Sequence, residues 1–103
     1  MGSYSDYVSS GLTAFHRILV DTYCSIPWQT TKCGYGCSDH ASWTKTGVAA
    51  VYTAESIMSK ENPNIHSTGD SMATVDVAYG VEFVILALAH VVELGSASAV
   101  IAA

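Results

Sequence analysis

Residues 74–94 are the most constraining segment of this sequence, because nearly every position in them is apolar. Their few polar side chains recur three or four positions apart, which is the spacing of one face of an α-helix. We therefore predict a helix whose narrow polar stripe faces water and whose remaining surface is covered on several sides. Leu86 fills the one gap in this polar stripe, which comprises Asp76, Tyr79, Glu82, His90 and Glu93.

The rest of the chain is too small to supply that cover. The sequence has 103 residues, enough for one domain at most, and a chain of this size buries about two-thirds of its unfolded surface. Half of the residues are hydrophobic and only 13% are charged, against roughly 25% in an average soluble domain. We expect such a chain to lie within something larger, to associate with itself, or to bind a partner.

The charge pattern argues against two kinds of partner. Four basic residues against nine acidic ones give a net charge of −5, without any basic cluster, so we expect no nucleic-acid binding. The most apolar stretch, residues 81–94, contains three polar residues and is too short to span a bilayer, so we expect no membrane insertion. Residues 1–20 lack the charged segment and apolar run of a signal peptide.

The first third of the chain predicts one strand and one helix. Residues 4–8 carry a weak strand pattern, and Ser9 or Ser10 can cap a helix with apolar positions at helical spacing. Pro27 ends that helix. Residues 30–36 are polar and contain glycine, which predicts a loop.

The remainder completes an α/β segment of about two strands and three helices. A short helix runs from a cap at Ser38 to Gly47, the usual kind of C-terminal stop. Residues 48–53 are continuously apolar, which predicts a strand covered on both faces. Residues 1–103 are expected to form a single segment, and the small residues 95–103 predict a frayed tail.

The three cysteines are compatible with more than one chemical state. Cys33 and Cys37 are close enough for a short disulfide loop, which leaves Cys24 over. The alternatives are a structural zinc site made by the three cysteines and His40, or a buried pair of free thiols. The spacing matches no common zinc finger, so we favour the disulfide.

Two motifs lead to a functional hypothesis. Residues 33–40 read Cys-Gly-Tyr-Gly-Cys-Ser-Asp-His, and residues 62–66 read Asn-Pro-Asn-Ile-His. Together, at this separation, they resemble the C-terminal part of the secreted zinc-dependent leucine aminopeptidases of bacteria and fungi. The resemblance covers nearly the whole chain and implies part of a larger fold, with a mixed sheet between helices and two adjacent zinc ions. In that family, a hydroxide bridging the zinc ions attacks the first peptide bond of a substrate with a free N-terminus.

The resemblance also implies roles for three polar residues. His66 resembles the last zinc ligand, and it follows the predicted buried strand, where α/β sheets usually place ligands. Tyr35 resembles the phenol that hydrogen-bonds the developing oxyanion, and Ser38 resembles the residue that orients the zinc-bound histidine. From the residues alone, an ordinary loop histidine, a packed tyrosine and a helix cap explain the same three positions.

The same resemblance places Cys37, Met58 and Ile65 on the walls of an apolar pocket for the first side chain of the substrate. From the residues alone, all three could equally be ordinary residues of the hydrophobic core. Ala54 and Glu61 stand where related enzymes can carry aromatic residues. The pocket is therefore expected to be wider or less apolar than in those enzymes, and a preference for leucine does not follow.

Much of the family's site is absent from this sequence. The other zinc ligands and the glutamate general base come, in that family, from sequence upstream of this chain, and one histidine cannot hold two zinc ions. We expect a C-terminal portion of an extracellular metallo-aminopeptidase that removes apolar N-terminal residues from peptides. Alone, without its N-terminal part, it is expected to be inactive. The alternatives are a non-catalytic module that associates with itself or a partner, and a structural zinc module.

Overall fold

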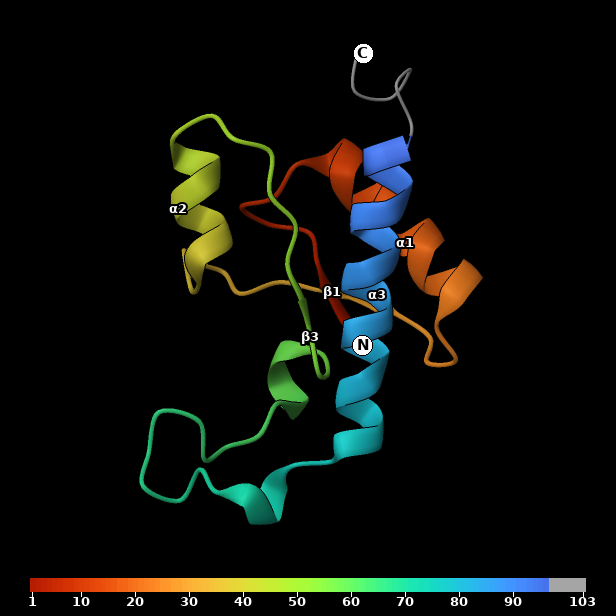
Figure 1. Ribbon diagram of the computed structural model, residues 1–103. Coiled ribbons are helices and arrows are strands. Elements are labelled where there is room, and N and C mark those ends of the chain that lie inside the picture. The colour runs from red at the N-terminus through yellow and green to blue at the C-terminus, as the bar shows by residue number, and fades with distance from the viewer. Residues whose placement is uncertain (97–103) are drawn as a thin grey trace.

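The computed structural model describes residues 1–96 (Figure 1). In these residues it contains three α-helices and three short strands, which is the predicted α/β composition with one strand more than expected. Most of the predicted frayed tail, residues 97–103, lies outside the described residues, while Gly95 and Ser96 belong to the last helix. In chain order the elements are β1 (Gly2–Tyr4), α1 (Ser10–Tyr23), β2 (Gln29–Thr31), α2 (Asp39–Lys45), β3 (Thr53–Ala54), the 3-10 turns Met58–Lys60 and Met72–Thr74, and α3 (Val77–Ser96).

The three strands form one mixed sheet in the order β2-β1-β3. The central strand β1 pairs in parallel with β2, where Ser3 lies opposite Thr30, and antiparallel with β3, where Ser3 lies opposite Thr53. Gly2 is required in β1, because a Cβ atom there would lie 2.0 Å from the carbonyl oxygen of Ser56. The sheet is mixed, as the family resemblance implies.

The first two strands differ from the sequence prediction. The strand predicted at residues 4–8 ends at Tyr4, because Tyr7 takes a left-handed conformation with φ of 56° that a strand does not accommodate. Strand β2 takes up Thr30 and Thr31, the first two residues of the loop predicted at 30–36. Its Gln-Thr-Thr sequence has no apolar alternation, so only its pairing with a strand far away in the sequence makes it a strand.

The third strand is shorter than predicted. Of the predicted strand 48–53, only Thr53 belongs to β3. The residues before Thr53 nevertheless run alongside residues 4–9 and accept hydrogen bonds from them. The Tyr4 amide donates to the carbonyl of Tyr52 at 3.0 Å, and the Ser9 amide donates to the carbonyl of Ala50 at 2.8 Å. Val48 is 48% exposed and residues 50–53 are half-buried, so the described residues 1–96 cover this segment only in part.

Helix α1 confirms the predicted capped, amphipathic helix. Ser9 is the cap, and its hydroxyl accepts a hydrogen bond from the Leu12 amide at 3.2 Å. Leu19 and Val20 on its inner face are almost fully buried. They form the hydrophobic core with three further buried residues, Met1, Leu86 and Ala89.

Helix α3 is present, but its polar stripe faces inward rather than toward water. The Glu82 carboxylate accepts hydrogen bonds from the Ser25 amide and hydroxyl, and Glu93 accepts one from the Tyr23 hydroxyl. His90 packs edge-on against a histidine of α1, with the ring centroids 5.2 Å apart. The predicted orientation is therefore wrong, because α1 and the turn after it supply polar partners for this stripe.

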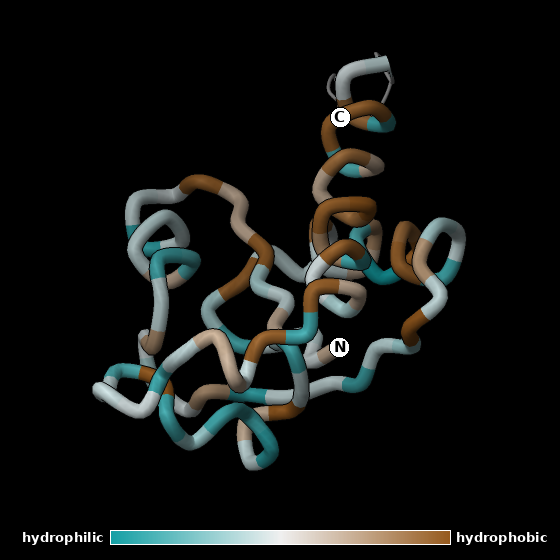
Figure 2. Tube along the Cα trace, turned by 60° about the horizontal axis from the view of Figure 1, so that its bottom comes forward, coloured by the Kyte–Doolittle hydropathy of each residue, from teal (hydrophilic) through white to brown (hydrophobic). Residues whose placement is uncertain are grey.

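Most of α3 is hydrophobic (Figure 2), and the large side chains on its outer face are exposed. Val84 is 65% and Leu88 is 62% exposed. The helix is longer than the apolar stretch 81–94, and by length and composition alone its 20 residues are apolar enough to cross a membrane. A core helix of a larger protein passes the same test. The outer face is completed by Val77, Val81, Ile85, Val91 and Val92.

Candidate active site

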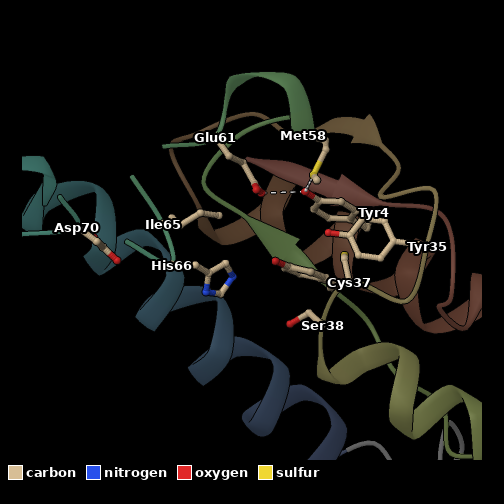
Figure 3. Close-up of a pocket in the computed structure, with 10 residues that line it drawn as sticks. Tyr4, Tyr35, Cys37, Ser38, Met58, Glu61, Ile65, His66 and Asp70 are labelled. Carbon is tan, nitrogen blue, oxygen red and sulfur yellow. Dashed lines mark hydrogen bonds between the residues drawn. The ribbon is translucent and has the colours of Figure 1, made fainter. Parts of the chain in front are cut away.

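A cavity of about 410 Å³ gathers all six residues that the sequence selects as site residues (Figure 3). They come from four places in the chain: the loop after β2, the start of α2, the first 3-10 turn and the loop that follows it. Segments far apart in the sequence therefore meet at one place. The selected residues that line the cavity are Tyr35, Cys37, Ser38, Met58, Ile65 and His66, and they are joined there by Tyr4, Tyr52, Glu61 and Asp70.

Tyr35 is presented by a disulfide loop. Cys33 and Cys37 are bonded to each other, with their Cα atoms 6.1 Å apart. The Cys37 amide donates to the carbonyl of Tyr35 at 2.8 Å, and Gly34 takes the left-handed φ of 83° that this tight turn needs. Tyr35 is 58% exposed, and its hydroxyl points into the cavity (Figure 3).

Asp6 fixes this loop to the rest of the molecule. Its carboxylate accepts hydrogen bonds from the amides of Cys33 at 3.1 Å and Gly34 at 2.7 Å. Burial alone would raise the pKa of Asp6, but these backbone hydrogen bonds outweigh it and lower the pKa. Asp6 is a positioning residue that sequence reasoning missed, because its partners are far away in the sequence.

The disulfide removes the alternative of a structural zinc site. Both sulfurs of Cys33 and Cys37 are used by the bond between them. Cys24 lies elsewhere, half-buried, with its thiol 3.6 Å from the carbonyl oxygen of Glu82; burial and then Glu82 raise the pKa of that thiol. His40 is buried and packs against Tyr52, with the ring centroids 4.5 Å apart.

Ser38 precedes α2 at the cap position, as predicted, but its side chain makes no capping hydrogen bond. The residue is exposed and lines the cavity instead. The capping explanation, which the sequence leaves open, therefore does not account for the serine hydroxyl. This hydroxyl lies beside the phenol of Tyr52, whose pKa burial raises and the hydrogen bond with Ser38 partly lowers again.

His66 lies at the tip of a loop built from successive turns. The carbonyl of Asn64 accepts hydrogen bonds from both the amide and the hydroxyl of Ser67, at 3.2 and 2.6 Å. His66 itself takes a left-handed φ of 62°, which is uncommon for a residue with a side chain. Residues held in such conformations cluster at functional sites. The turns present the exposed imidazole at the cavity (Figure 3).

The apolar walls of the cavity are open to solvent in the described part of the chain. Met58 is 38% exposed and Ile65 is 43% exposed. The wall beside Met58 is closely packed, because Tyr4 is fully buried and stacks on Tyr52, with the ring centroids 4.4 Å apart. Sequence reasoning missed both tyrosines as cavity residues, because an aromatic side chain gives no sign in the sequence of the wall on which it lies.

The described residues supply few donor atoms for zinc at the cavity. Within residues 1–96, no three His, Cys, Asp or Glu side chains come together as a metal site. His66 is the one histidine among the residues that line the cavity. A protein zinc centre takes at least three such ligands. The described residues therefore do not make a zinc centre, and they fit the contribution of one ligand to a shared centre.

Comparison with known proteins decides the family. Residues 3–90 match the family model described as Peptidase family M28. The chain belongs to peptidase family M28. This M28 chain is 41% identical, over 95 residues, to leucine aminopeptidase 1 of Metarhizium robertsii, and the match covers 92% of the chain and 24% of that relative.

Comparison with solved structures supports the same family. The LapA aminopeptidase of Legionella pneumophila superposes on the M28 chain with a TM-score of 0.89 at 34% identity, covering 93% of the chain and 26% of LapA. LapB of the same organism gives a TM-score of 0.89 at 38% identity, covering 93% of the chain and 26% of LapB. The chain therefore has the fold of a piece of these proteins, and it spans about a quarter of their length.

Proposed function

We propose that this chain is the C-terminal part of an M28 metallo-aminopeptidase that removes N-terminal residues from peptides. The observation that carries the proposal is that all six residues selected by the family resemblance line one cavity. In the proposed site, His66 supplies one zinc ligand, Tyr35 donates to the oxyanion, and Ser38 orients a zinc-bound histidine. When bound, zinc supplies an activated water and polarises the substrate carbonyl.

The remaining zinc ligands and the general base are proposed to come from the N-terminal part of the fold. Two findings support this: the described residues provide a single histidine at the cavity, and the chain spans about a quarter of its relatives. The exposed apolar face of α3 is proposed to pack against that N-terminal part. An extracellular location is also part of the proposal, supported by the disulfide, because disulfides persist in oxidising compartments.

The test uses a hybrid enzyme, the LapA hybrid, in which this chain replaces the matching quarter of Legionella pneumophila LapA. The LapA hybrid is expected to release p-nitroaniline from leucyl p-nitroanilide in a reaction that a zinc chelator abolishes. The 103-residue chain alone is expected to release none. A folded hybrid without aminopeptidase activity would contradict the proposed function, and chelator-sensitive activity of the chain alone would contradict its dependence on an N-terminal part.

A second candidate function is favoured by one observation. The outer face of α3 is a continuous apolar surface that would also suit a non-catalytic module that associates with itself. Light scattering on the chain alone distinguishes the two functions when it is combined with the hybrid assay. A defined oligomer together with an inactive hybrid favours the module.

A further inference from the structure

The cavity carries a carboxylate on its wall, that of Glu61. The Tyr4 hydroxyl donates a hydrogen bond to Glu61 Oε1 at 2.8 Å and lies 3.5 Å from the sulfur of Met58 (Figure 3). Glu61 is half-buried, so part of its hydration is already removed. By the family resemblance, related enzymes can carry an aromatic residue at this position. A charged group therefore lies on a wall that the resemblance implies is apolar.

The partner of Glu61 is a proton donor that does not titrate near neutral pH. Burial, and then the hydrogen bond and the charge of Glu61, raise the pKa of the Tyr4 phenol. Tyr4 therefore remains protonated and donates to the carboxylate without neutralising it. Tyr4 is fully buried and stacked on Tyr52, so it also fixes the direction in which Glu61 points.

No basic side chain of the described residues balances this charge at the cavity. The residues that line it include the carboxylates Glu61 and Asp70 and neither lysine nor arginine. Lys60, the sequence neighbour of Glu61, lines a different cavity together with Met1 and Ile57. A partly desolvated carboxylate is favourable when a cation pairs with it, so the cavity is complementary to a cationic ligand.

We propose that the cavity selects substrates whose first side chain is cationic, lysine or arginine, and that Glu61 is the residue that determines this specificity. The inference rests on the proposed function, because it assigns a substrate class to the same site. The aliphatic stem of such a side chain packs on Met58 and Ile65, while its charged end donates to the Glu61 carboxylate. The substrate class is therefore peptides with an N-terminal basic residue.

The test compares lysyl and norleucyl p-nitroanilides, which have the same unbranched chain with and without a terminal amine. In the LapA hybrid, kcat/KM is expected to be higher for the lysyl substrate. Glu61→Gln is expected to lower kcat/KM for the lysyl substrate roughly tenfold, the effect of losing one hydrogen bond to a charged group. For the norleucyl substrate it is expected to change kcat/KM less than about twofold, because that side chain has no group to pair with the charge.

Glu93→Gln is the matched control. It removes the same charge from a carboxylate that, like Glu61, accepts a hydrogen bond from a tyrosine hydroxyl, but that lines a separate cavity between α1 and α3. It is expected to leave the ratio of the two kcat/KM values unchanged. The inference is overturned if the norleucyl substrate is preferred, or if Glu61→Gln lowers both values alike, since Glu61 would then serve the α-amine or the fold.

A second measurement uses the 103-residue chain itself, so it tests the inference even if the LapA hybrid does not fold. In an NMR titration, lysinamide is expected to shift the amide signals of Tyr4, Glu61 and Ile65 at lower concentrations than norleucinamide, and Glu61→Gln should abolish the difference. Equal or reversed binding, or no shift with lysinamide, overturns the inference. A hybrid that cleaves leucyl but not lysyl substrates overturns the inference alone. A folded hybrid that cleaves neither overturns the proposed function as well.

Discussion

Among the residues around the cavity, Tyr35 is the one whose replacement should affect catalysis with the least effect on folding. Its side chain is 58% exposed and ends in a hydroxyl that points into the cavity. In the LapA hybrid, we predict that Tyr35→Phe lowers kcat roughly 100-fold or more, because one oxyanion donor is lost. KM and the thermal midpoint should hardly change. Steady-state kinetics with leucyl p-nitroanilide and a thermal melt measure these quantities.

Tyr7→Phe is the control for this prediction. Tyr7 is also exposed, but it lines a separate cavity with Ala41 and Lys45. Its replacement should leave kcat within about twofold, since it is placed in no step of the proposed chemistry. Full activity in the Tyr35→Phe variant would contradict the role proposed for Tyr35.

His16 makes the stability of the chain depend on pH. Burial, and then the charge of His90, lower the pKa of His16 from 6.5 to about 4, and its Nδ1 lies 3.2 Å from the Thr53 hydroxyl. The folded chain therefore favours neutral His16. This contribution to stability is complete above pH 6.5 and is lost as the pH falls toward 4. The loss amounts to about 3 kcal/mol of unfolding free energy.

Urea unfolding of the 103-residue chain at pH 7 and pH 4.5 measures this contribution. His16→Gln, which cannot take up a proton, should flatten the dependence of the unfolding free energy on pH. His66→Gln, at an exposed loop position, should keep it. Equal pH dependence in the parent chain and in His16→Gln would show that His16 is not the group responsible.

The sequence singles out residues of the cavity that lie in a motif, and it misses residues that are placed there by packing. His66 and Tyr35 lie in motifs, and the structure places both at the same cavity. Asp6 and Tyr4 act through contacts with residues 27 and 57 positions away. A local pattern contains no information about such contacts, which exist only once the sheet has formed.

Among the elements, helix α3 shows how a correct periodicity can lead to the wrong orientation. The spacing of its polar residues identifies a helix with one polar stripe, and both features are present. The prediction takes water to be the partner of that stripe, whereas Ser25 and Tyr23 are its partners. Strand β2 is missed for a related reason, because its partner strand and not its composition makes it a strand.

The apolar outer face of α3 predicts association of the chain in isolation. We predict that Val84→Lys combined with Leu88→Lys lowers the average mass that light scattering measures for the 103-residue chain, because both side chains belong to that face. In the LapA hybrid the same pair should lower the thermal midpoint, since two charges would be buried against the N-terminal part.

The control pair is Ala14→Lys with Thr22→Lys, on the exposed side of α1. It adds the same charge to a different helix, so any effect of charge alone appears in both pairs. The association proposed for α3 is contradicted if the two pairs have equal effects on mass and on the midpoint of the hybrid.

For the whole molecule, composition already indicates that the chain lacks enough residues to cover its apolar surface. A chain that is half hydrophobic and 13% charged exposes more apolar surface than it can bury, and seven large apolar residues of α3 remain exposed. The chain spans about a quarter of its relatives, and the proposed N-terminal part supplies the missing cover. The number of helices and the mixed sheet follow from the sequence and the resemblance. The strand limits do not, because they depend on pairing partners.

The most direct test of the central claim is the zinc content of the folded LapA hybrid, measured by elemental analysis after dialysis against trace zinc. The claim is that this chain completes a two-zinc centre with His66. We predict about two zinc ions per hybrid, as the family resemblance implies, and at least one fewer in His66→Ala, because an imidazole ligand is lost. Equal zinc content in the two proteins would contradict the claim.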